Sequence, residues 1–157
     1  MPVAGRNRRK YLLERFGRLG PFAAGQKQLL ELGSSMGITF DLEAIEHAPN
    51  TRSAHALVAA AWRGSPQMQA KLIETLFVAY FTEGCDIGDP AALEKIAVDA
   101  GMSAAMASAA LDDENPHAEI VPLEAPAQDL QITGVPTFIF HRKHRFSGTQ
   151  RPEFFFS

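Results

Sequence analysis

The stretch that decides the fold is GVPTFIFHRKHRFSGTQ, residues 134–150. Its segment Thr137-Phe138-Ile139-Phe140 is short and rich in aromatic and β-branched residues, which favours a buried strand. The polar segment at 141–145, HRKHR, predicts a turn, and Phe146-Ser147-Gly148 predicts the returning strand. The sequence therefore predicts a β-hairpin near the end of the chain.

The residues before this hairpin predict helices. Ser65-Pro66 and Asp89-Pro90 each place a capping residue directly before a proline, an arrangement that begins a helix. Asn50 or Thr51 is a further candidate cap. Apolar residues at helical spacing, with glycines at several of the ends, predict helices at about 8–16, 21–36, 51–64, 66–81, 90–100 and 103–111.

The strongest amphipathic pattern lies in the helix expected at 66–81. Its apolar stripe consists of Leu72, Ile73, Leu76, Phe77, Tyr80 and Phe81. Such a stripe either packs into the core of its own chain or serves as a dimer surface, and we expect it to form core.

Composition excludes several classes of function. With 157 residues and a hydrophobic fraction of 46%, the chain is long and apolar enough for one folded domain. A net charge of −3 disfavours nucleic acid as a partner, and the sequence has neither a secretory signal nor an apolar run of membrane-spanning length. We therefore expect a cytoplasmic protein with no membrane contact.

The cysteine count is the tightest constraint. Cys85 is the one cysteine in the sequence, so the chain can form neither an intramolecular disulfide, nor a two-cysteine redox motif, nor a multi-thiolate zinc site. Cys85 follows an expected helix end, where the helix dipole does not stabilise a thiolate, so we do not expect it to be a nucleophile. His141 and His144 lie among arginines and lysine, which disfavours a bound cation. We predict no catalytic residue, no metal and no cofactor.

Ordered motifs carry a family resemblance. The segment 134–150 resembles the GVPTF…SGxQ signature of DsbA-like thioredoxin-fold proteins. Upstream, residues 49–57, 76–84 and 86–89 resemble the PNT..AH.L, LF.AYF.EG and DIGD blocks of the FrnE-like branch of the DsbA family. Together these blocks extend over most of the chain, from about residue 8 to residue 150.

The resemblance implies a fold class and a division of the chain. The expected fold is α/β, thioredoxin-like (DsbA-like) with a large helical insertion, truncated at both ends so that it is mostly α with a β-hairpin. Residues 1–130 would form the helical domain, and residues 131–157 the distal part of the thioredoxin-like domain. The opening strand, the CPWC-type motif and the final helix of the family have no counterpart here, and Pro122 and Pro126 interrupt an expected helix.

The resemblance also implies a substrate-binding site. The family's proline is cis, so Pro136 is expected to be cis and the backbone of Val135 to pair with an extended substrate, with Thr137 beside it. Asn50, Thr51 and His55 belong to the PNT..AH.L block and are further substrate-binding candidates.

Three functions remain open at this stage. The first is protein disulfide oxidoreduction of the FrnE type, acting on a protein or peptide thiol or disulfide and inactive in this chain alone because the CxxC segment is absent. The second is a glutathione-dependent isomerase of the 2-hydroxychromene-2-carboxylate type, which shares the fold. The third is a non-catalytic module that binds a peptide or partner chain, with a homodimer as one form.

Overall fold

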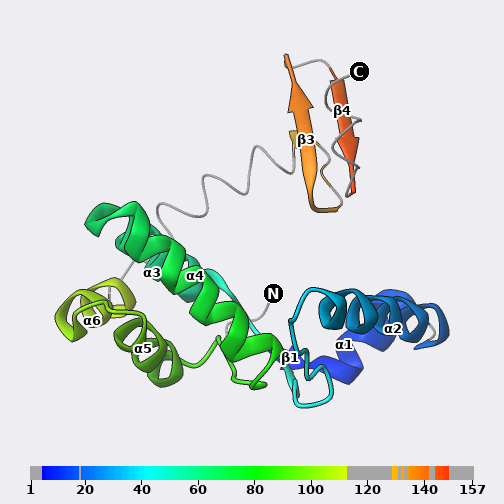
Figure 1. The fold of residues 1–157 in the computed structure, drawn as a ribbon, viewed down its shortest axis with the longest axis horizontal. Helices are drawn as coiled ribbons and strands as arrows, with labels where there is room; N and C mark the ends of the chain where they lie inside the picture. The colour runs from blue at the N-terminus through cyan, green and yellow to red at the C-terminus, as the bar shows by residue number, and fades with distance from the viewer. Residues whose placement is uncertain are drawn as a thin grey trace. The chain divides into compact units, whose positions relative to one another are not determined.

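The computed structural model describes residues 5–17, 19–112, 129–130, 132, 134–141 and 144–148. The chain divides into two compact units, residues 1–120 and 121–157, which are described separately (Figure 1). The boundary that we expected between residues 130 and 131 stays a prediction. Pro122 and Pro126, which we expected to interrupt a helix, lie outside the described residues.

The described part of the first unit is mainly helical. Its helices are α1 (Arg8–Phe16), α2 (Leu19–Ser35), α3 (Arg52–Gly64), α4 (Pro66–Phe81), α5 (Pro90–Asp99) and α6 (Ala104–Asp112). All of the predicted helices are confirmed. The largest difference is at α2, which begins at Leu19, two residues before the predicted Pro21, while the other helix ends lie within one residue of the prediction.

Side chains cap the helices where the sequence predicts capping. The Ser65 hydroxyl accepts a hydrogen bond from the Met68 N–H at 3.0 Å, and the Asp89 carboxylate accepts one from the Ala92 N–H at 3.1 Å. At the start of α3, Thr51 occupies the cap position but its side chain makes no capping bond. The neighbouring Asn50 side chain instead accepts from the Arg52 N–H at 3.1 Å. Of the two candidate caps, Asn50 is thus the one that bonds to the helix.

The core of the first unit lies among α3, α4, α5 and α6 (Figure 1). Leu57, Leu72 and Leu93, from three of these helices, have no exposed surface. Alanines from α3, α5 and α6 fill the space around them and let the helices approach closely. None of the polar or charged residues in the described ranges is buried. This core therefore depends on apolar packing.

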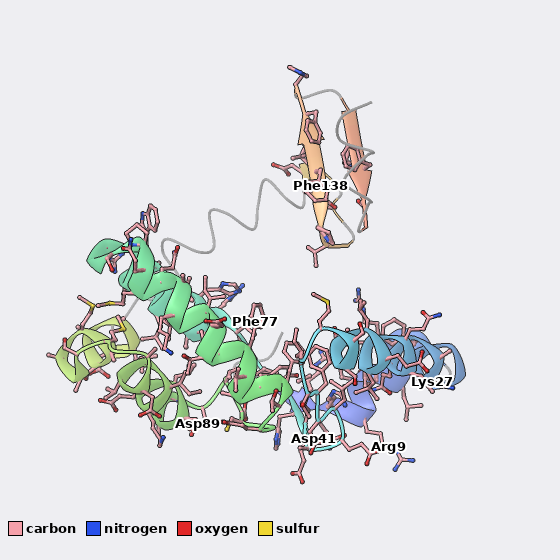
Figure 2. All side chains as sticks on the ribbon, in the orientation of Figure 1. Arg9, Lys27, Asp41, Phe77, Asp89 and Phe138 are labelled. Carbon is pink, nitrogen blue, oxygen red and sulfur yellow. The ribbon has the colours of Figure 1, made fainter. Side chains whose placement is uncertain are left out.

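The expected core stripe of α4 is only partly buried. Leu72 and Leu76 belong to the core, as predicted. Phe77 is 59% exposed, so the prediction that it packs into the core is wrong (Figure 2). The stripe is wider than the surface that α3 and α5 cover, and Phe77 lies at its uncovered margin.

A short pairing of distant segments was not predicted. Strand β1 (Arg6–Asn7) pairs antiparallel with β2 (His47–Ala48). Next to it, the Arg8 N–H donates to the Glu46 carbonyl at 2.9 Å. This pairing holds the start of α1 against the loop that precedes α3.

The second unit contains the predicted hairpin. Strand β3 (Thr137–Phe140) pairs antiparallel with β4 (His144–Ser147), with Phe138 opposite Phe146. The Phe146 ring stacks on those of Phe138 and Phe140, with centroids 5.4 and 5.3 Å apart. The prediction that β4 begins at Phe146 and includes Gly148 is wrong. Strand β4 begins two residues earlier because cross-strand pairing extends to His144. It ends at Ser147, before Gly148, whose φ is 90°.

Candidate functional site

The segment directly before β3 is the candidate site. The peptide bond between Val135 and Pro136 is cis, the isomer that the resemblance implies. Val135 is 90% exposed, the largest exposed fraction among the large hydrophobic residues of the described chain. The Val135 side chain therefore makes almost no packing contact within the chain.

Hydrogen bonds hold this segment on both sides of Val135. The Thr137 hydroxyl donates to the Gly134 carbonyl at 2.7 Å, and its oxygen lies 2.7 Å from the Ser147 hydroxyl. Since a hydroxyl has one hydrogen to donate, Ser147 is the donor in the second bond. The Gly148 N–H donates to the Pro136 carbonyl at 2.8 Å. The loop is thus fixed by its own strands.

The backbone of Val135 differs from that of its two neighbours in its hydrogen bonding to the described residues. Within the described ranges no hydrogen bond joins Val135 to another residue, whereas the carbonyls of Gly134 and Pro136 are both occupied. An extended peptide binds through backbone N–H and C=O groups of this kind and places alternate side chains in adjacent contacts. The geometry therefore suits an extended polypeptide ligand.

The sequence profile of the DsbA-like thioredoxin domain matches residues 22–157, which is most of the chain. The chain belongs to this DsbA-like family. The predicted DsbA family and the predicted thioredoxin-like fold class are thereby confirmed, while the FrnE-like branch stays a prediction. A comparison with curated protein sequences gave no match.

A solved structure agrees with the DsbA-like assignment. The crystal structure of a probable DsbA oxidoreductase from Streptomyces coelicolor superimposes with a TM-score of 0.75 at 27% sequence identity. The match covers 96% of this chain and 64% of that protein. The DsbA-like chain described here thus spans less than two thirds of the length of the protein that it resembles.

The remaining substrate-binding candidates lie in the first unit, at the start of α3. Asn50 is half-buried and engaged as a cap, whereas Thr51 and His55 are exposed. The His55 N–H donates to the Thr51 carbonyl at 2.9 Å, so these two residues belong to one helical turn. The structure thus brings Asn50, Thr51 and His55 together, while Val135, Pro136 and Thr137 form the loop of the other unit.

Cys85 lies just beyond α4, in a half-buried position against the helical core. Its N–H donates to the Ala79 carbonyl at 2.8 Å, and its sulfur lies 3.9 Å from a Glu83 carboxylate oxygen. These contacts place the Cys85 side chain in the packing at the edge of the helical core.

Metal sites and membrane-spanning helices are two further classes of feature. No group of three or more His, Cys, Asp and Glu residues in those ranges could hold a metal ion. None of the helices in the described ranges is both long and apolar enough to cross a bilayer.

One contributor to the loop was missed at the sequence level. Ser147 was part of the SGxQ motif, yet we did not include it among the site residues. Its hydroxyl bond to Thr137 shows that it helps to position the segment that carries Val135. The motif itself was the available signal, because it places Ser147 on the strand that returns beside Thr137.

Proposed function

We propose that this chain is a substrate-facing part of a FrnE-like protein disulfide oxidoreductase and that it does not catalyse thiol-disulfide exchange by itself. The observation that carries the proposal is the exposed Val135, whose backbone is unbonded within the described residues and whose neighbours are held in place by Thr137 and Ser147. A protein or peptide thiol or disulfide is the proposed ligand.

The proposed lack of activity follows from the chemistry of exchange. A thiolate attacks one sulfur of a disulfide, and a second thiol must then attack the mixed disulfide to release the product and complete the two-electron transfer. With Cys85 as its one cysteine, the chain has no second thiol for that step. Without an external thiol, Cys85 could therefore form no more than a mixed disulfide.

An insulin-reduction assay with dithiothreitol tests the catalytic half of the proposal. We expect the full chain to leave the reduction rate equal to that of the protein-free reaction, and Cys85→Ser to behave in the same way. A two-cysteine DsbA protein serves as positive control. Acceleration by the full chain that Cys85→Ser abolishes would show that the lone thiol is catalytic and would overturn this half.

Peptide binding tests the other half. The probe is fluorescein-labelled insulin B chain with carboxymethylated cysteines, followed by anisotropy. Val135→Pro removes the backbone N–H, whereas Val135→Ala keeps it, so we expect Val135→Pro to bind about fivefold more weakly than Val135→Ala. Thr137→Val, which keeps the shape but loses the hydroxyl bonds, should also bind more weakly. Equal affinities for all variants, or no binding by the unmodified chain, would count against the proposal.

A further inference from the structure

Two adjoining cavities lie in the first unit, far along the sequence from the hairpin. One has a volume of about 500 Å³ and is bordered mainly by the apolar residues Phe16, Leu29, Leu42 and Phe81. The other, of about 670 Å³, is bordered by charged residues that include Arg9, Glu43 and Glu46. Arg8 borders both, so it lies where an apolar surface meets a polar one. Both volumes fall in the range typical of sites for small organic ligands.

Arg8 has spare hydrogen-bonding capacity at this junction. It is half-buried, and its guanidinium donates to the Leu42 carbonyl at 2.7 Å. A guanidinium carries five N–H donors. Among the described residues Arg8 forms no ion pair, although Glu43 and Glu46 border the polar cavity and nearby Arg6 does pair with Glu14 at 3.2 Å. Arg8 is therefore a fixed cation that lacks an anionic partner in the described part of the chain.

The apolar wall beside Arg8 is also incompletely covered. Phe16 is 50% exposed and Leu29 is 41% exposed. Phe81 completes this wall, and its ring meets that of Phe40 edge-on with centroids 6.1 Å apart. Contact with a ligand chain would remove apolar surface from water at each of these residues, which is favourable.

We propose that the two adjoining cavities together form a groove that binds a small amphipathic carboxylate. The carboxylate lies on the Arg8 guanidinium, and its aliphatic chain lies along Phe16, Leu29 and Phe81. One guanidinium matches one carboxylate in a bidentate pair. Arg8 and Arg9 balance the charges of Glu43 and Glu46 around the polar cavity, so the site repels a single negative charge less than it repels a dianion. The apolar residues of the other cavity make no favourable contact with an inorganic anion. The proposal is independent of the function proposed above, because it uses no residue of the hairpin.

Calorimetric titration of the full chain with decanoate at pH 7, below its micelle concentration, tests the site. Decanol has the chain without the charge, and acetate has the charge without the chain. We expect decanoate to bind about tenfold more tightly than either, since the site requires both parts. Amide shift changes on addition of decanoate should centre on residues 8, 16 and 29.

Variants separate the two halves of the site. Arg8→Gln and Phe16→Ala should each weaken decanoate binding, Arg8→Gln by about tenfold. Lys10→Gln is the matched control, because Lys10 is a cation on the same helix that borders neither cavity. Equal binding by Arg8→Gln and Lys10→Gln, or no binding of decanoate at millimolar concentration, would overturn the proposal. If Arg8→Gln does not fold, equal affinities for decanoate and decanol would overturn it instead.

Discussion

The helical core and the β-hairpin differ in how they are stabilised. In α3 to α6, leucines and alanines are buried against one another, and no polar residue in the described ranges is buried. In the hairpin, residues 134–141 and 145–148 are all partly or largely exposed, and strand pairing, a ring stack and hydroxyl bonds order them. The segment that carries the family's most specific motif is thus the one with little core of its own. A conspicuous sequence motif therefore need not lie in the part of the chain whose packing contributes most to stability.

The largest expected effect is loss of a fully buried leucine from the helical core. Leu72→Ala should lower the free energy of unfolding by about 2–5 kcal/mol, because it leaves a cavity among α3, α4 and α5. Urea denaturation followed by far-ultraviolet circular dichroism measures the change. Phe77→Ala, on the same helix but exposed, should cost less than about 1 kcal/mol. Equal costs for the two variants would contradict the placement of the core.

A smaller effect is expected at the helix caps. Ser65→Ala removes the hydroxyl that accepts from Met68 and should cost about 1 kcal/mol in the same denaturation measurement. Thr51→Ala is the matched control, since the Thr51 side chain makes no capping bond and its loss should be nearly neutral. A larger cost for Thr51→Ala than for Ser65→Ala would reverse the capping assignment.

The hairpin should depend on its aromatic stack. Phe146→Ala removes both ring contacts and should destabilise the strand pairing by about 0.5–1.5 kcal/mol. Amide hydrogen exchange at residues 137–140 and 144–147 measures this, with the α3 amides of the same sample as reference. Unchanged exchange in the strands would show that the stack does not order the hairpin.

The smallest effect concerns pH. Burial is the main cause that raises the pKa of Tyr80 above its ordinary value of 10.0, with Arg8 acting in the opposite direction. Because the folded pKa lies above the unfolded one, the unfolded chain loses this proton first as the pH rises. Protonated Tyr80 thus contributes to the free energy of unfolding below pH 10, and this contribution is lost as the pH rises through the folded pKa.

Tyr80→Phe should remove that part of the alkaline destabilisation, and unfolding midpoints measured between pH 8 and 11 check it. At neutral pH the change should be small, although the variant also loses the hydrogen bond to the His47 carbonyl at 3.2 Å. An unaltered alkaline slope would assign the destabilisation to other groups.

Much of this structure could be predicted from local pattern. Ser65-Pro66 and Asp89-Pro90 mark the starts of α4 and α5 because a cap needs only a side chain and the next three residues. The hairpin followed from its strand residues and from the GVPTF…SGxQ motif. The family was predicted from motif order, while the roles of Asn50, Thr51 and His55 stay predictions.

What the sequence by itself determined is the set of helices, the hairpin and the absence of a second cysteine, since each depends on neighbouring residues or on a count. The tertiary structure decided which side of α4 is covered, that residues 6–7 pair with 47–48, and that Arg8 reaches Leu42. These contacts join residues up to 42 positions apart, such as Arg6 and Ala48, so no local periodicity encodes them. The burial of a leucine and the lack of an anionic partner for Arg8 both depend on which segments meet in space. Burial marks the core, whereas exposed or unpaired groups mark the candidate sites.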